Sequence, residues 1–270
     1  MSIATEDRAM TVSRRVRRSW LVVGSAFTFV MLGFGTLQAV TQVAHDEHNE
    51  SRSFAAGQVA RVEVESDSGD IRIVGTDETR ITVVERVSDG LRSTDHSVDI
   101  VDDRLVVRAT CPGFLTSFCR VDFTIRVPTT VDVIIRADED VELSDIDGAI
   151  NVETGGGSVN ARRLGGDTIR LVADHGSVRV TEIHAARVEV SADHGDVSLE
   201  FSSDPTNVDA FTDHGHVEVI VPRSTQPYRV DASSEHGSVE TPIRTDPTSE
   251  RTIRASSDHG DVSVRYAASG

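Results

Sequence analysis

The chain has 270 residues, with 27 basic and 44 acidic side chains and a formal net charge of −17. All basic residues are arginine, since the sequence contains no lysine. This acidity argues against phosphate-directed binding of nucleic acid, and an aromatic content of 4% leaves Val, Ile, Leu and Ala to build the core.

The N-terminal residues have the pattern of a membrane anchor. Residues 1–19 carry five arginines and two acidic residues, whereas residues 20–44 carry no charge. As a helix, such a segment spans roughly 37 Å, enough to cross a hydrocarbon core about 30 Å thick. Arginines before the span predict a cytoplasmic N-terminus. We therefore expect a cytoplasmic tail (1–19), a transmembrane helix (20–44) and a short charged stalk (45–56).

A cleaved signal peptide is the alternative for the same segment. Its apolar region is normally about 7–15 residues long and ends in a small-x-small site. Here the apolar stretch is longer, and Ala39 and Ala44 follow Leu37 and Gln42, which suit a peptidase poorly. Either interpretation places residues 45–270 outside the cytoplasm.

Residues 57–130 are expected to form an N-terminal β portion that contains both cysteines. Alternating apolar and polar residues predict strands at 80–84, 97–101, 104–108 and 120–127, which we interpret as an antiparallel cap over the first repeat. Cys111 and Cys119 are eight positions apart. In an oxidising compartment this pair most simply forms a structural disulfide, because the spacing is not that of a C-x-x-C redox motif.

An internal repeat fills most of the rest of the chain. Each unit has a glycine, a β-branched residue seven positions before it, a small residue three before it and another β-branched residue two after it. The glycines are Gly69, Gly157, Gly176, Gly195, Gly215, Gly237 and Gly260. Apolar residues with a period of two on both sides of a turn predict a strand, a tight turn and a strand, with glycine supplying a positive φ.

Strand–turn–strand units that repeat along the chain predict a stacked, parallel β-solenoid, resembling a single-stranded β-helix, over residues 131–270. Residues 131–143 have the same pattern without the glycine, and we interpret them as a degenerate coil. The last unit ends near Tyr266 without an obvious cap, so its strand edges could accept another chain. The fold class is accordingly all-β, with one N-terminal transmembrane helix.

These motifs resemble the bacterial putative-adhesin family with β-strand repeats, the DUF4097-type domain. The resemblance rests on a strand that ends in Val127-Pro128 and on repeated glycine turns such as 67–71 and 154–159. It covers about residues 55–266 and implies an extracytoplasmic β-solenoid without established catalytic activity.

The chain departs from the family pattern at five turns, where histidine replaces serine and follows an acidic residue. We call these ten residues the acidic-His ladder: Asp174, His175, Asp193, His194, Asp213, His214, Glu235, His236, Asp258 and His259. Equivalent residues of stacked coils lie about 4.8 Å apart, so the carboxylates repel one another. Three interpretations stay open: duplicated turn chemistry, a divalent metal such as zinc or copper, and partial protonation of the imidazoles.

Other polar residues offer no catalytic site. Asp138, Glu139 and Asp140 are expected to form a solvated turn, and His184 and His216 are expected to be surface residues outside the ladder. No nucleophile motif such as G-x-S-x-G is present, and no cofactor other than a divalent metal is indicated.

The sequence therefore predicts a membrane-anchored, extracytoplasmic, adhesin-like binding or scaffolding module that is not an enzyme. Its expected partners are a cell-envelope component, another protein or a second copy at the C-terminal edge of the solenoid, and not nucleic acid. A β-helix carbohydrate-active enzyme and an accessory protein of an envelope-stress signalling system are the alternatives.

Overall fold

The computed structural model describes residues 46–89, 94–111 and 119–268, and all statements below concern these residues. The expected cytoplasmic tail and transmembrane helix, 1–19 and 20–44, lie outside this part of the chain. Among the described residues, no helix has the length and apolarity needed to cross a membrane.

The described part contains strands and one short 3-10 helix, η1. The elements are β1 (Asp46–Ala55), η1 (Ala56–Gln58), β2 (Arg61–Ser66), β3 (Ile71–Thr76), β4 (Arg80–Asp89), β5 (Asp95–Val101), β6 (Arg104–Thr110), β7 (Arg120–Pro128), β8 (Asp132–Ala137), β9 (Val141–Ile146), β10 (Ile150–Thr154), β11 (Val159–Leu164), β12 (Thr168–Ala173), β13 (Val178–Ile183), β14 (Arg187–His194), β15 (Val197–Phe201), β16 (Asn207–His214), β17 (Val217–Val221), β18 (Arg229–Ser234), β19 (Val239–Glu240), β20 (Thr252–His259) and β21 (Val262–Tyr266).

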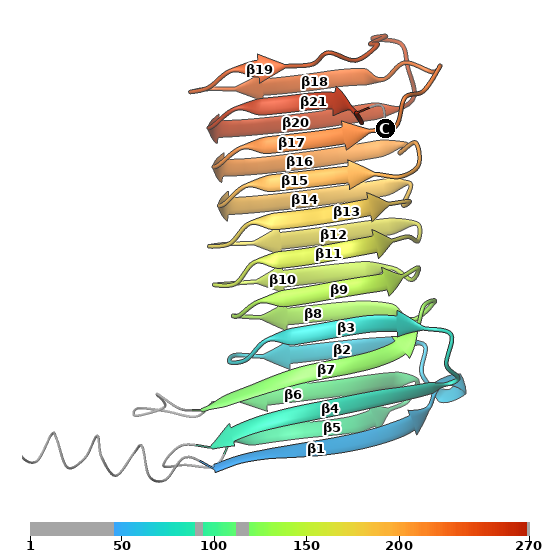
Figure 1. Cartoon of the computed structure of the whole chain (residues 1–270), viewed down its shortest axis with the longest axis vertical. Helices are drawn as coiled ribbons and strands as arrows, with labels where there is room; N and C mark the ends of the chain where they lie inside the picture. Colours follow the sequence, from blue (N-terminus) through green and yellow to red (C-terminus); the bar gives the residue numbers. More distant parts are fainter. Residues whose placement is uncertain (1–45, 90–93, 112–118, 269–270) are drawn as a thin grey trace, which may run out of the picture. The chain divides into compact units, whose positions relative to one another are not determined.

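These strands form two facing sheets that stack as coils, which confirms the predicted β-solenoid (Figure 1). Each coil has one strand in each sheet, joined by a tight turn at one edge and connected to the next coil by a return loop at the other. Neighbouring coils are parallel and in register; Ile150, for example, stands beside Ile169 in one sheet, and Val159 beside Val178 in the other. The predicted Val and Ile positions face inward and form one buried apolar core.

The predicted degenerate coil is β8–β9. Val133 of β8 stands beside Ile150 of β10, and Val141 of β9 stands beside Val159 of β11. Its strands are therefore regular members of the stack, although its turn lacks the glycine.

The predicted positive φ is present at Gly69, Gly215 and Gly260, and the close approach of successive backbones is a second reason for glycine that was not predicted. A Cβ atom at Gly195 would lie 2.3 Å from the carbonyl oxygen of Gly176, and one at Gly176 would lie 2.1 Å from that of Gly157. Neither Gly176 nor Gly195 has a positive φ, whereas Gly69 has a φ of 106°. For most of these turns the close approach of successive backbones, and not a left-handed conformation, excludes a side chain.

The small residue three positions before each glycine lies at the corner of the core, as its size suggested. Where it carries a hydroxyl, that hydroxyl donates to a turn carbonyl, which belongs to the same turn for Ser66 and to a neighbouring turn for the others. Thr212 donates to Gly195 at 2.8 Å and Ser257 donates to Gly215 at 2.8 Å. A buried hydroxyl thus satisfies turn carbonyls that point away from the strand ladders.

The order of the last two coils differs from the expected sequential stack. β20 pairs with β16 and β21 pairs with β17, so the final repeat lies inside the stack. β18 and β19 pair with the other sides of β20 and β21 and form the end of the two sheets. The prediction that the coil ending near Tyr266 leaves an open edge is therefore wrong, because β18–β19 covers it.

The opposite end of the stack is also out of chain order. β6 and β7 lie parallel to β2 and β3, so they form a further coil rather than the expected antiparallel layer. Antiparallel strands do follow: β5 pairs with β6, β4 with β7 and β1 with β4. Residues 46–55 of the expected stalk are instead strand β1, which pairs with β4 along its whole length.

Candidate functional site: the turn edge

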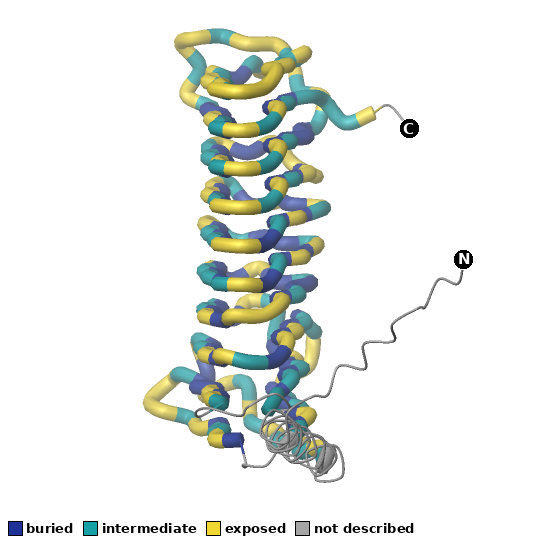
Figure 2. The backbone as a smooth tube through the Cα atoms, turned by 90° about the vertical axis from the view of Figure 1, so that its left-hand side faces the viewer, coloured by how far each residue is buried: buried dark blue, intermediate teal, exposed yellow. Residues whose placement is uncertain are grey.

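The tight turns of the solenoid lie above one another and form a continuous polar edge, which we call the turn edge. It comprises residues 138–140, 155–158, 174–177, 193–196, 213–216, 235–238 and 258–261. Figure 2 looks onto this side of the stack and shows a row of largely exposed turns. Because the strands on both sides are in register, equivalent turn residues of successive coils lie directly above one another.

The five ladder histidines stack face to face along the turn edge. The ring centroids are 5.3 Å apart for His175 and His194, 4.9 Å for His194 and His214, and 4.6 Å for His214 and His259. His236 completes the stack beyond His259, also at 4.6 Å, and all the interplanar angles are 7° or less. Sequence spacing predicted this column, except that His259 precedes His236 because the last two coils exchange places.

The first ring of the stack has a defined proton position. Nδ1 of His175 lies 3.2 Å from the carbonyl oxygen of Gly155, which can only accept a hydrogen bond. His175 therefore carries hydrogen on Nδ1, and its Nε2 faces away from this contact. This hydrogen bond to the backbone fixes the orientation of the His175 ring, on which His194 stacks.

The acidic members of the ladder do not make the side-chain contacts that one of the three interpretations, duplicated turn chemistry, requires. No hydrogen bond or ion pair joins the side chains of Asp174, Asp193 or Asp258 to the described residues, and the same holds for Asp213 and Glu235. Side-chain turn chemistry is instead supplied by another position, the residue directly after each glycine.

The residue directly before the second strand of each coil, which follows the glycine where the turn has one, accepts a hydrogen bond from the backbone of the next coil. The Asp140 carboxylate accepts from the Ser158 N–H at 2.8 Å, Ser158 Oγ from Ser177 at 3.3 Å, and Ser177 Oγ from Asp196 at 3.1 Å. The Asp196 carboxylate accepts from His216 at 2.8 Å. These bonds connect successive turns, and the Ser/Asp bias at this position was the sequence signal that could have identified them.

His216 belongs to this second row and has contacts beyond those of a plain surface residue. Its Nδ1 accepts a hydrogen bond from the Asp261 N–H at 2.9 Å and lies 3.6 Å from the Asp261 carboxylate. Asp261 in turn accepts hydrogen bonds at 2.8 Å from the Ser238 N–H and hydroxyl. These two donors lower the pKa of Asp261. His184 is exposed, as expected, and contacts Asp147 at 2.9 Å.

The ladder as observed is poorly arranged to chelate a metal ion. No group of three or more His, Cys, Asp or Glu side chains in the described part of the chain is placed to hold one. An imidazole lone pair lies in the plane of its ring, so parallel rings direct their lone pairs side by side and not toward a shared ion. Metal binding at the ladder would require the rings to turn, and it stays a prediction.

A buried ionic cluster near the N-terminal end of the stack was not predicted. Glu85 of β4 is fully buried, and its carboxylate lies 3.6 Å from Nε of Arg52 and 3.7 Å from Nε2 of His96. Neither carboxylate oxygen accepts a hydrogen bond from the described residues. Burial raises the pKa of Glu85, although Arg52 and His96 act in the opposite direction. Glu85 shares the inward face of β4 with Ile81, Val83 and Val87, and a carboxylate in this apolar alternation is the signal that could have revealed it.

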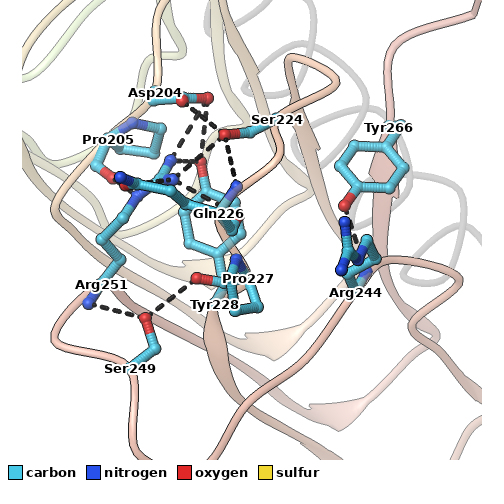
Figure 3. Close-up of polar contacts among 10 residues, drawn as sticks. All are labelled: Asp204, Pro205, Ser224, Gln226, Pro227, Tyr228, Arg244, Ser249, Arg251 and Tyr266. Carbon is cyan, nitrogen blue, oxygen red and sulfur yellow. Dashed lines mark hydrogen bonds and ion pairs between the residues drawn. The ribbon is translucent and has the colours of Figure 1, made fainter.

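A second cluster holds the return loops together where the coil order changes (Figure 3). The Arg251 guanidinium donates to the Tyr228 hydroxyl and to the carbonyl of Pro205, and it pairs with Asp204 at 3.2 Å. Tyr228 is fully buried, and this burial raises the pKa of its hydroxyl. Arg251 directly precedes β20, so these contacts hold the chain where it enters between β16 and β18.

Cys111 and Cys119 form the predicted disulfide, with their Cα atoms 5.8 Å apart. The bridge joins the end of β6 to the start of β7, which is the place that a glycine turn occupies in the repeating coils. The Ser68 hydroxyl donates to the Cys119 carbonyl at 2.9 Å. The disulfide therefore closes the turn of the coil next to β2–β3.

In-register parallel coils, an inward ladder of β-branched residues and a row of polar turns define the protein as a β-solenoid. A family model described as Toastrack DUF4097 matches residues 61–265, and the chain belongs to this family. This confirms the resemblance to the DUF4097-type putative-adhesin family. A comparison with curated proteins gave no significant match.

The solenoid is similar to several solved structures. A putative adhesin from Bacteroides fragilis has 14% identity and a TM-score of 0.49, covering 82% of this chain and 97% of the other. A putative cell adhesion protein from Clostridium sporogenes has 10% identity and a TM-score of 0.40, covering 82% and 100%. A putative lipid binding protein from Parabacteroides distasonis has 9% identity and a TM-score of 0.41, covering 82% and 97%.

Proposed function

We propose that this protein is a non-catalytic, adhesin-like binding and scaffolding module of the cell envelope. Residues 20–44 anchor it in the membrane, and the solenoid lies outside the cytoplasm. The charge pattern of residues 1–44 supports this orientation. The Cys111–Cys119 disulfide also supports it, because such bonds persist in oxidising compartments.

The observation that carries the proposal is the stack of five parallel imidazoles on an exposed edge. Its polar groups recur at a nearly constant spacing, with an unpaired carboxylate beside each ring. A repeating array can contact an extended partner, such as a cell-wall polymer or a protein segment, at several equivalent points. Many weak contacts of this kind combine into useful affinity without a deep pocket.

The same regularity favours a binding module over a carbohydrate-active enzyme. Glycoside hydrolysis requires two carboxyl groups in different environments, placed on opposite sides of one bond. Along the turn edge the carboxylates share one environment from coil to coil. A surface of repeated groups serves multivalent binding better than chemistry at a single point.

The binding edge is tested with the full chain in detergent and purified bacterial cell-wall sacculi. We expect the chain to sediment with the sacculi, and a variant with His175, His194, His214, His236 and His259 all changed to Ser to bind at least about tenfold more weakly. Changing His184, an exposed histidine outside the stack, to Ser is the matched control and should leave binding unchanged. Absence of co-sedimentation, or equal binding of all three proteins, would contradict the proposal.

The orientation is tested separately in intact cells with a membrane-impermeant maleimide. Ser203 lies in an exposed return loop, so Ser203→Cys should be labelled. The native cysteines should not react, because they are paired with each other. Ser13→Cys lies in the expected cytoplasmic tail and should be labelled only after lysis. The opposite labelling pattern would overturn the orientation without affecting the binding assay.

A further inference from the structure

The end of the stack formed by β18 and β19 leaves the apolar core incompletely covered. The inward residues Val230 and Ala232 of β18 are only partly buried, and Val239 of β19 is 42% exposed. The equivalent positions one coil further in, Ile253, Ala255 and Val262, are buried. Two strand edges and the end of a hydrophobic core therefore face solvent together.

The backbone groups on the free side of β18 can be assigned. Arg229 and Glu235 donate their N–H groups toward β20, to Arg251 and Ser257. Since a residue's N–H and C=O point the same way in a strand and alternate along it, those of Val230, Ala232 and Ser234 point away from β20. The outward groups of Tyr228 are already bonded to Arg244 and Asp246. The open edge is thus limited to residues 230–234.

We propose that a second copy of this chain pairs with this edge, β18 against β18, antiparallel and centred on Ala232. In this register Ala232 stands opposite Ala232, and Val230 stands opposite Ser234 of the second copy. All three outward residues then exchange hydrogen bonds with the other copy. Centring on Val230 instead would place Ala232 opposite Tyr228, whose outward groups are occupied.

The charges on the strand agree with the same register. It places Arg229 opposite Glu235 of the second copy, and twofold symmetry repeats this pair. Neither side chain forms an ion pair among the described residues. Elsewhere this sheet pairs opposite charges across adjacent strands, as Arg254 does with Asp209 at 3.3 Å. Arg229 and Glu235 would complete that pattern across the interface.

The symmetry axis also accounts for the exposed core. A twofold axis perpendicular to the sheet continues both sheets from one copy to the other and sets β19 beside β19. This brings the partly exposed Val230, Ala232 and Val239 into the interface and removes apolar surface from water. It also reverses the stacking direction, so the β1 ends of the two copies lie at the far ends of the dimer.

The test measures the oligomeric state of the full chain in density-matched detergent by sedimentation equilibrium. We expect a reversible dimer. Arg229→Glu and Glu235→Arg each put like charges opposite one another at two symmetric places, which should raise the dissociation constant about tenfold. The double variant Arg229→Glu/Glu235→Arg restores opposite charges and should recover the wild-type constant.

Two further variants guard against effects on folding. Arg254→Glu changes a charge on the same face one strand further in and should leave the dimer unchanged. Ala232→Pro removes an outward N–H without breaking a bond to β20, so it should weaken the dimer and leave far-UV circular dichroism intact. A monomer at the highest concentration, or a dimer insensitive to both single charge changes, would overturn the proposal, whatever the chain binds through its turn edge.

Discussion

The two ends of the solenoid cover the apolar core to different extents. At one end, the antiparallel strands β1, β4 and β5 and a disulfide close the stack, and inward residues such as Val83 and Val98 are buried. At the other end, a single coil lies over the inserted β20–β21 and remains half exposed. A solenoid needs a terminal layer whose outer side tolerates water, and only the first end has a complete one.

The difference shows what a cap requires. The complete cap changes strand direction and places charged groups, including Glu85 and Arg52, on positions that would otherwise continue the core. The incomplete cap keeps the repeat pattern, so it keeps an edge that another strand can join. Three experiments probe the two ends and a fourth probes the turn edge between them, starting with the largest expected effect.

Removing the Arg251 side chain should cause the greatest loss of stability. Arg251→Met breaks the contacts to Asp204, Tyr228 and Pro205 that hold β20 in its inserted place. Loss of a largely buried cation with several partners costs about 3 kcal/mol. Arg244→Met, an exposed arginine of the same loops, is the control and should cost less than about 1 kcal/mol. Denaturant unfolding of both variants measures the difference, and equal costs would contradict the account.

Removing the disulfide should weaken the closed end by a smaller amount. The combined Cys111→Ser and Cys119→Ser variant loses the constraint on a short loop, which the chain-entropy model values at about 2 to 3 kcal/mol. Thermal unfolding with and without reductant provides the measurement. Wild-type protein in reductant should match the variant, and an unchanged melting temperature in both would show that the bridge does not stabilise this end.

The buried Glu85 predicts a dependence of stability on pH. Its pKa is raised in the folded state, so its stabilising contribution is present below the unfolded pKa and is lost as the pH rises through the folded pKa. Glu85→Gln should therefore gain stability relative to wild type as the pH increases from 5 to 8. Glu50→Gln, a half-exposed neighbour, should show a flatter difference. A stability advantage of Glu85→Gln that shrinks toward pH 8 would contradict this sign.

Metal ions should have the smallest effect. Because the parallel imidazoles of the ladder do not converge on one point, we expect no change in melting temperature when zinc, copper or calcium is added after EDTA treatment. A saturable rise of several degrees that is lost when the five ladder histidines are changed to Ser would instead show that the ladder binds metal.

Much of the repeating region could be predicted from sequence, since its periodicity repeats locally in every coil. The β-branched residues around each glycine predicted the strands, the core and the column of histidines, and the short spacing predicted the disulfide. Turn chemistry was one of three open interpretations for Asp174 and its equivalents, and the structure shows such contacts at Asp196 instead. The two aspartates look alike in sequence, and only the stacking of backbones distinguishes them.

The ends of the stack could not be predicted in the same way. The repeat units that contain Val230 and Ile253 have the same pattern of inward residues. The sequence therefore does not indicate which of the two coils lies at the end of the stack. The order is decided by long-range contacts such as that of Arg251 with Asp204. Strand β1 was likewise hidden, since His48, Glu50 and Arg52 occupy inward positions and hide the apolar alternation that marks a strand.

The most direct test of this account is the order of the last coils, read by cysteine pairs on the outer face of one sheet. Phe211 stands beside Ser256, whereas a sequential stack would place Ser233 there. In the full chain, Phe211→Cys with Ser256→Cys should form a disulfide, detected by mass spectrometry. Phe211→Cys with Ser233→Cys should not, because these positions are about 9.6 Å apart across the inserted strand. Bond formation by the second pair and not the first would contradict the inserted coil.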